Sequence, residues 1–294
     1  MTNKKSFLET ILCCPKCKGD LVYSADTSQC RLCHSEFPIK NGKYYFIDIN
    51  HDDELNDGLD IVKHAVKRFR ALYYLSIMLL SPVLYNGYHK KILKKLDGFI
   101  INVGSGNSVI GDNVINVDMF DYEYVTVVAD IQRLPFKSSS LDGVFNIAVL
   151  EHVQEPVRVI EESFRVLKDG GVIFSVVPFM QPFHASPHDY YRTSRSGIKF
   201  LHRDYNEIDV GVYGGPVSGF LWVFQEFLAL ILSFGIKPLR DFLYLMVMVL
   251  TWPLKFLDVF FKKLPTADNI ASTFYFYGKK VVDHAPKSNK HNIK

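Results

Sequence analysis

A run of apolar residues that ends in two closely spaced glycines constrains the fold of this chain more than any other stretch. Residues 99–108 read FIINVGSGNS, in which four of the first five residues are apolar and lead into Gly104 and Gly106. This pattern predicts a buried parallel strand and a glycine turn, where backbone N–H groups can approach a nucleotide-like ligand. Val109 stands where a dinucleotide fingerprint has its third glycine, which argues against a nicotinamide cofactor. On these residues alone, a tight turn that binds nothing remains the alternative.

Strands and helices alternate after the glycine turn. Strands are expected at residues 114–118, 125–130, 144–149 and 172–177, with an amphipathic helix at 155–167. This alternation predicts an α/β fold with a doubly wound, mostly parallel sheet. Asp118 ends the second strand, where a carboxylate can accept hydrogen bonds from a ribose diol, and Asp130 ends the third, where it can lie near an adenine edge.

Two further strands, expected at residues 206–213 and 272–281, complete a sheet of seven strands, and a long apolar insert separates them. Within the insert, residues 215–265, one run (220–236) is interrupted only by Glu226 and another (242–254) carries no charge. Neither run reaches the roughly 18 apolar residues of a membrane-spanning helix. We expect a helical hairpin that dips into one membrane leaflet, with packing on its own sheet or on a second subunit as the alternative.

Four cysteines near the N-terminus have the spacing of a zinc site. Two CxxC pairs, twelve residues apart, consist of Cys14, Cys17, Cys30 and Cys33. Their thiolates can surround one Zn²⁺ tetrahedrally, and a domain this small needs such a stabilising ion because its core is thin. A structural zinc ribbon is therefore favoured over a redox pair. His34 is a possible substitute ligand, and Cys13 is expected to be a spare thiol.

Charge is unevenly distributed along the 294 residues, although the net charge is only +3. Residues 61–96 contain eight lysines and arginines and no acidic residue. This stretch could face anionic lipid or nucleic acid, or form a solvated helix face. The N-terminus has no clean apolar run typical of a secretory signal, so we expect a cytoplasmic protein, with contact to the inner face of the cell membrane as an open possibility.

The strands and loops together resemble a known enzyme family. The series VGSG, Asp118, ADIQRLPF, SLDGVFNIAVLEHV and RVLKDGGVIFSVVP, within residues 99–177, resembles the class I S-adenosylmethionine methyltransferases of the methyltransferase-11 type. The resemblance implies a cofactor site made by Val103, Gly104, Ser105, Gly106, Asp118, Met119, Asp130 and Ile131. The glycines would lie against the methionine part, Asp118 at the ribose, and Asp130 with Ile131 at the adenine.

One departure from the family pattern concerns the glycine turn. Only eleven residues separate Gly106 from Asp118, so the helix that normally follows the turn must be very short. The basic stretch before the sheet could supply the missing cover over the cofactor.

The cysteine-rich segment has a resemblance of its own. The sequences CPKCKGDL, CRLC and FPIKNGKYYFI resemble zinc ribbons of the Trm112 type, and also the zinc domain at the front of some rRNA guanine methyltransferases. Such a domain would bind a partner or support substrate binding. The expected organisation is a ribbon at 1–50, a linker and basic helical cap at 51–98, a methyltransferase domain at 99–282, and a disordered tail at 283–294.

A loop rich in proline and histidine follows the fifth strand, at the edge where open sheets hold their substrates. It contains His184, His188 and Arg192. With His152, the two histidines are candidate general bases for an acceptor that must lose a proton, or they only orient the loop backbone. Arg192 could hold a phosphate or carboxylate of the acceptor.

The sequence predicts a membrane-associated methyltransferase that moves a methyl group from S-adenosylmethionine to a small-molecule or lipid-linked acceptor, with Zn²⁺ in its ribbon. An rRNA or tRNA methyltransferase is one alternative, supported by the ribbon and the basic stretch. A non-catalytic scaffold is another, supported by the short connection after Gly106. The acceptor, the methylated atom and the oligomeric state stay open.

Overall fold

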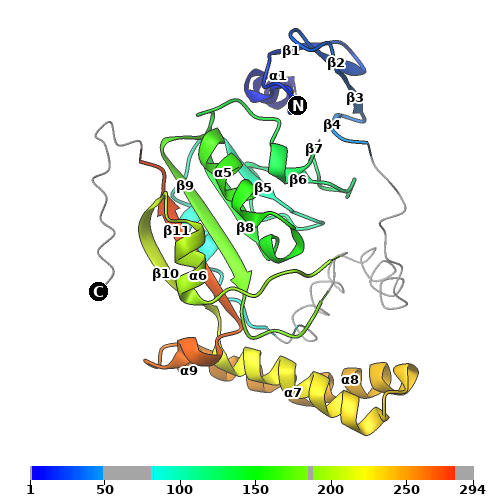
Figure 1. Ribbon diagram of the computed structural model, residues 1–294, viewed down its shortest axis with the longest axis vertical. Helices are drawn as coiled ribbons and strands as arrows, with labels where there is room; N and C mark the ends of the chain where they lie inside the picture. Colours follow the sequence, from blue (N-terminus) through cyan, green and yellow to red (C-terminus); the bar gives the residue numbers. More distant parts are fainter. Residues whose placement is uncertain (1, 49–80, 82, 185–187, 282–294) are drawn as a thin grey trace.

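The computed structural model describes residues 2–48, 81, 83–184 and 188–281. Most of the basic stretch and the tail at 283–294, expected to be disordered, lie outside these residues. The described strands form one sheet with the order β1-β2-β3-β4-β7-β6-β5-β8-β9-β11-β10 (Figure 1).

Seven strands make the central part of the sheet, as the sequence predicted. They are β5 (Ile100–Val103), β6 (Val114–Asp118), β7 (Val127–Val128), β8 (Leu141–Ile147), β9 (Leu167–Pro178), β10 (Asn206–Gly214) and β11 (Thr273–Lys279). Neighbours from β7 to β9 pair in parallel, whereas β11 runs antiparallel to both β9 and β10. This order, with one reversed strand near the edge, is that of the class I methyltransferase fold.

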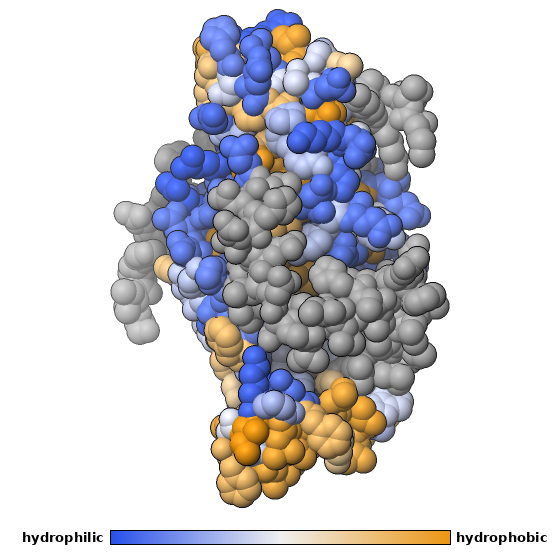
Figure 2. Space-filling view, turned by 90° about the vertical axis from the view of Figure 1, so that its right-hand side faces the viewer, coloured by the Kyte–Doolittle hydropathy of each residue, from blue (hydrophilic) through white to orange (hydrophobic). Residues whose placement is uncertain are grey.

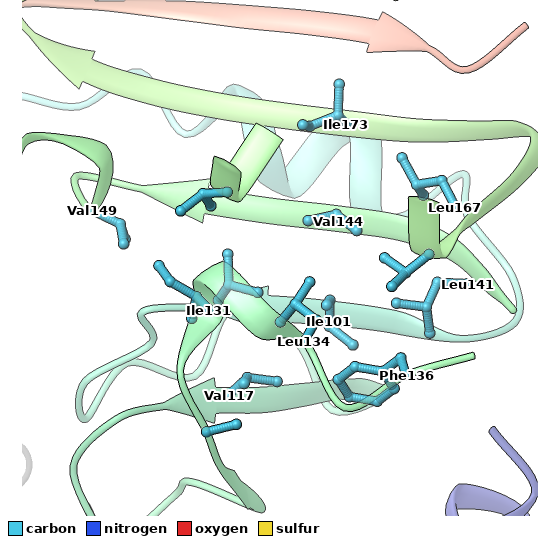
Figure 3. Packing of buried hydrophobic residues seen from close by; sticks show 14 of the residues in the cluster. Ile101, Val117, Ile131, Leu134, Phe136, Leu141, Val144, Val149, Leu167 and Ile173 are labelled. Atoms are coloured by element: carbon cyan, nitrogen blue, oxygen red, sulfur yellow. The ribbon is translucent and has the colours of Figure 1, made fainter. Parts of the chain in front are cut away.

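Strand register places apolar rows on both faces of the sheet. Ile101, Val144 and Ile173 pair in register across β5, β8 and β9, and their side chains lie in one layer (Figure 3). All three are fully buried. On that face pack α5 (Pro156–Val166) and α6 (Arg195–Leu201). Phe145 and Phe174 belong to the opposite core, so the central strands are buried on both faces, as parallel strands usually are.

The opposite face is covered in part by α4 (Tyr88–Leu93). Tyr88 packs against Tyr275 with ring centroids 5.0 Å apart, and His89 bonds the Tyr213 hydroxyl through Nδ1 at 2.5 Å. The described end of the basic stretch therefore lies on the sheet rather than over the cofactor site. Between Gly106 and β6 the chain forms turns, and the very short helix that the sequence suggested is absent from this connection.

The cysteine-rich segment is joined to the sheet edge. It consists of α1 (Thr2–Ile11), β1 (Leu21–Tyr23), β2 (Thr27–Cys30), β3 (Glu36–Lys40) and β4 (Lys43–Tyr45). Strand β4 pairs in parallel with β7, placing Tyr44 opposite Val127. Leu12 also forms a bridge with Phe136, and the N–H of Cys13 donates to the Pro135 carbonyl at 2.9 Å. The segment and the central sheet share one continuous core.

The apolar insert forms two long antiparallel helices, α7 (Pro216–Ser233) and α8 (Lys237–Thr251). Three shorter helices follow them, η4 (Trp252–Leu257), α9 (Asp258–Phe261) and η5 (Ala267–Ile270). Because β10 runs parallel to β9, the insert leaves from the carboxyl edge of the sheet (Figure 1). The buried carboxylate of Asp258 fixes the start of α7 by accepting the N–H groups of Val217 and Ser218 at 2.8 and 2.9 Å.

Candidate active site

The glycine turn after β5 has a backbone that favours glycine. Gly104 has φ +63°, and a Cβ atom there would lie 2.4 Å from Cγ1 of Val149. Gly106 has φ +52°, yet a Cβ atom there would meet nothing within 4 Å. The first glycine is therefore required for packing, whereas the second leaves open space beside its backbone.

Asp118 lies directly under this turn, at the end of β6. Its carboxylate is buried and accepts the N–H groups of Gly106 at 2.7 Å and Phe120 at 3.0 Å. Burial raises the pKa of Asp118, and these N–H groups oppose the shift by stabilising the charged form. A carboxylate held in this way is oriented to accept further hydrogen bonds from a hydroxyl-bearing ligand.

Asp130 follows β7 and begins the short helix η2 (Ile131–Arg133). Its Oδ1 accepts the N–H of Gln132 at 2.8 Å, which caps the helix. The cap fixes Asp130 and the buried Ile131 side by side at the edge of the sheet. This is the position that the resemblance implies for the adenine.

A cavity of about 460 Å³ joins these groups, which is within the usual range for a small-molecule site. Six of the eight predicted cofactor residues line it, namely Gly104, Gly106, Asp118, Met119, Asp130 and Ile131. Val103 and Ser105 are buried behind the wall instead. The open space beside Gly106 and the two aspartates in the cavity wall fit an adenosine-type ligand with a polar tail.

Two of the three predicted histidines line the same cavity. His152, from η3 (Leu150–His152), and His188, from the loop after β9, both contribute to its wall. Nδ1 of His152 lies 2.5 Å from the His188 carbonyl oxygen, so the two segments are held together. His184 lies just outside the wall, with its ring centroid 5.5 Å from that of His152.

Sequence reasoning missed Glu151, which lies between these histidines. Its Oε1 is 3.8 Å from Nε2 of both His152 and His184, although the two histidines are far apart in the chain. The residue is only 1% exposed, and neither carboxylate oxygen has a hydrogen-bond partner among the described residues. The only sequence signal was an acid next to a candidate histidine in LEHV.

Arg192 is engaged within the loop after β9. Its guanidinium pairs with Asp189 through two nitrogens, and it also donates to the carbonyls of Gln181 and Pro182. Burial favours the neutral form of Asp189, but the Arg192 guanidinium outweighs it and holds the pKa of that carboxyl below its usual range. The structure therefore places Arg192 as a brace for the loop, with its guanidinium bonded to groups of that loop.

The four predicted zinc ligands converge, and their sulfur atoms all lie within 4.8 Å of one another. Cys14 and Cys33 have Sγ atoms 3.6 Å apart, and those of Cys17 and Cys30 are 3.4 Å apart. Four sulfurs about 2.3 Å from one Zn²⁺ would be roughly 3.8 Å apart, so the cluster fits a tetrahedral zinc ion. Cys13 is buried elsewhere, as expected for a spare thiol.

Large apolar side chains are exposed along α7, α8 and the segment after them, where Figure 2 shows them gathered at the lower end of the molecule. Contrary to the expectation from the apolar runs, two helical stretches, Pro216–Ser233 and Lys237–Phe261, are long and apolar enough to cross a membrane by length and composition alone. Only 39% and 17% of their most apolar 18-residue segments are buried. We refer to the exposed side chains between residues 220 and 264 as the apolar face. A groove of about 470 Å³ lies beside it, between the loop after β9 and the two helices, with Phe179, Pro182, Phe227 and Leu230 in its wall.

Comparison with known proteins supports the fold that the strand order indicates. Residues 110–175 match the family model described as a methyltransferase domain, a segment that includes β6 and most of β9. The match of this segment and the strand order both point to the class I methyltransferase fold.

Two curated relatives match within a limited part of the chain. One is a probable S-adenosylmethionine-dependent methyltransferase of Mycolicibacterium smegmatis, 31% identical over 88 residues, which are 26% of this chain and 34% of the relative. The other is a demethylmenaquinone methyltransferase of Protochlamydia amoebophila, 33% identical over 52 residues, 18% of this chain and 22% of the relative. The chain thus spans about a third or less of either relative. Among solved structures, the [4+2]-cyclase SpnF is 15% identical with a TM-score of 0.44, over 67% of this chain and 82% of the cyclase.

Proposed function

We propose that this protein transfers a methyl group from S-adenosylmethionine to a small-molecule or lipid-linked acceptor at a membrane surface. The observation that carries the proposal is the cavity at the carboxyl edge of the sheet. The glycine turn, Asp118 and Asp130 line it together with His152 and His188. The match of residues 110–175 to a methyltransferase domain supports the same chemistry.

The cavity residues divide into two groups by what they would hold. Asp118 would accept hydrogen bonds from the ribose hydroxyls, and Asp130 with Ile131 would border the adenine. The cofactor would supply a methyl group on a positively charged sulfur, which needs an acceptor atom in line with the carbon–sulfur bond. His152 and His188 line the same cavity, so they would orient an acceptor or take its proton.

The apolar face supports a lipid-linked acceptor. It is formed by α7 and α8, which leave the sheet at the same edge as the cavity. Exposed apolar surface of this extent is uncommon on soluble monomers and favours contact with a membrane or partner. The apolar groove beside Phe179 and Leu230 would receive the hydrocarbon part of such an acceptor.

Calorimetry with S-adenosylmethionine and S-adenosylhomocysteine tests the proposal on wild type, Asp118→Asn and Glu123→Gln. Micromolar binding by wild type is expected. Asp118→Asn should weaken it at least tenfold, about 1.4 kcal/mol, because the charged hydrogen bonds to the ribose are lost. The exposed Glu123 lies outside the cavity wall, so its substitution is the matched control.

Absence of binding by folded, zinc-loaded protein would overturn the enzymatic proposal and favour the scaffold. Salt-dependent binding of RNA without flotation on liposomes would instead favour an RNA acceptor.

A further inference from the structure

We propose that Glu151, His152 and His184 form a binding site for a divalent transition-metal ion beside the cofactor cavity. Their ligand atoms, one carboxylate oxygen and two imidazole nitrogens, all lie within 4.8 Å of one another. The carboxylate oxygen is 3.8 Å from each Nε2. Two ligand atoms that are each about 2.1 Å from one ion can be up to about 4.2 Å apart, so these distances suit a shared ion.

Hydrogen bonds at the far side of each imidazole direct a lone pair into the site. Nδ1 of His152 lies 2.5 Å from the His188 carbonyl oxygen, and Nδ1 of His184 lies 3.1 Å from the Pro182 carbonyl oxygen. A carbonyl oxygen only accepts, so each Nδ1 donates, and in the neutral imidazole the lone pair therefore lies on Nε2, which faces the site. A backbone carbonyl on the distal nitrogen is the usual support of a metal-binding histidine.

Arg192 does not change this assignment, although its Nη2 lies 3.3 Å from Nδ1 of His184. That nitrogen bears two hydrogens. They go to the Pro182 carbonyl at 2.7 Å and to Oδ2 of Asp189 at 2.6 Å. The guanidinium charge is thus directed to the Asp189 carboxylate.

Glu151 provides the independent observation that points to a cation. Its carboxylate is 1% exposed, and neither oxygen has a hydrogen-bond partner among the described residues. A buried charge without a partner is costly, and such groups in proteins are paired or bind metals. A divalent ion among the three groups would neutralise this carboxylate and supply its missing partner.

The ligand set indicates which ions fit. Two imidazoles and one carboxylate suit transition-metal dications such as Mn²⁺, Fe²⁺, Co²⁺ or Zn²⁺, whereas Mg²⁺ and Ca²⁺ prefer oxygen ligands only. Three protein ligands leave coordination positions open. His152 also lines the cofactor cavity, so these positions are next to it.

The role of the ion rests on the proposed function. A hydroxyl of the acceptor would occupy an open position, and the ion would lower the pKa of that hydroxyl. Its proton leaves to water, an oxygen–carbon bond to the methyl group forms, and the carbon–sulfur bond breaks with its electron pair remaining on sulfur. The site therefore selects acceptors methylated on oxygen.

Manganese binding to the full-length chain tests the site, after the cysteine cluster has been loaded with one equivalent of zinc. Electron paramagnetic resonance of free Mn²⁺ gives the affinity. One Mn²⁺ per chain is expected in the micromolar range, weakened at least tenfold in both Glu151→Gln and His184→Gln. Glu155→Gln is the matched control, because this exposed acid pairs with Arg158 and lies outside the cluster.

The outcomes that contradict the proposal are distinguished from misfolding and from failure of the proposed function as follows. Absence of Mn²⁺ binding by wild type, or unchanged affinity in both variants, would overturn the proposal. Melting of the metal-free proteins checks folding, and Glu151→Gln should melt no lower than wild type because it removes an unpaired charge. Binding of S-adenosylhomocysteine is measured separately, so its absence beside normal Mn²⁺ binding would refute the proposed function and leave the metal site standing.

Discussion

The imidazole of His184 lies against the indole of Trp222, with ring centroids 5.2 Å apart and planes inclined by 34°. His184 belongs to the loop after β9, next to Glu151 and His152, whereas Trp222 belongs to α7. The contact therefore joins the candidate active site directly to the helices that carry the apolar face. Movement of these helices at a membrane would therefore shift the imidazole of His184.

Truncation of Trp222 should impair catalysis without affecting the cofactor. Trp222→Ala removes the aromatic surface that orients His184, so methyl transfer into a total lipid extract should fall at least threefold. The affinity for S-adenosylhomocysteine should stay within twofold, because Trp222 is not part of the cofactor cavity. Trp252→Ala, which removes a ring packed on Phe256 instead, is the control. Equal turnover in wild type and Trp222→Ala would contradict the coupling.

The two glycines of the turn should respond differently to alanine. At Gly104 the new methyl group would collide with Val149 in a left-handed backbone, so urea unfolding should show a loss of about 3 kcal/mol. At Gly106 only the backbone strain applies, about 1 kcal/mol, while the methyl group occupies space beside the cavity. Gly106→Ala should thus fold and bind S-adenosylhomocysteine more weakly. Equal stability of the two variants would show that the Val149 contact is unimportant.

Zinc removal should destabilise the whole described fold rather than the cysteine-rich segment alone. Strand β4 extends the sheet through β7, and both parts share one core, so loss of the metal exposes the edge of the sheet. Chelation, or Cys30→Ser, should lower the melting temperature of the single transition by several degrees. Cys13→Ala should retain zinc because Cys13 is outside the cluster. A separate low-temperature transition with an unchanged main one would argue that the two parts fold independently.

Stability should fall in mild acid because of His202. Complete burial lowers the pKa of this imidazole to about 4, and its neutral ring accepts from Ser175 through Nε2 at 2.7 Å. The ordinary pKa is near 6.5, so between pH 6.5 and 4 the unfolded chain binds a proton that the folded one does not. The free energy of unfolding should therefore drop by up to about 1.4 kcal/mol per pH unit over this window. His202→Gln should flatten this dependence relative to wild type, and an unchanged slope would refute the assignment.

Charges placed on the apolar face should release the protein from membranes. Phe234 and Leu250 are 89% and 72% exposed, so Phe234→Asp with Leu250→Asp should leave the fold intact. The fraction of protein that floats with anionic liposomes should fall by at least half, because burying a charged side chain in the membrane is unfavourable. Phe200→Asp is the control, since this residue is 70% exposed on α6, away from the insert. Retained flotation of the double variant would indicate that the helices form a protein interface instead.

The sequence by itself determined the elements and the local chemistry. Apolar runs marked every central strand, the glycine turn could be located from Gly104, and the spacing of the cysteines predicted their cluster. These features are local, because the periodicity of a strand, the backbone conformation of a turn and the spacing of metal ligands all depend on residues that are close together in the sequence.

Only the tertiary structure decided which distant residues meet. The pairing of β4 with β7 made the cysteine-rich segment part of the sheet, although no local pattern distinguishes an added edge strand from a separate hairpin. The carboxyl edge of β8 and the loop after β9 brought Glu151 to His184, and α7 brought Trp222 to the same imidazole. These contacts depend on strand order and on the paths of the loops. Long-range packing sets both, and neither produces a periodic pattern in the sequence.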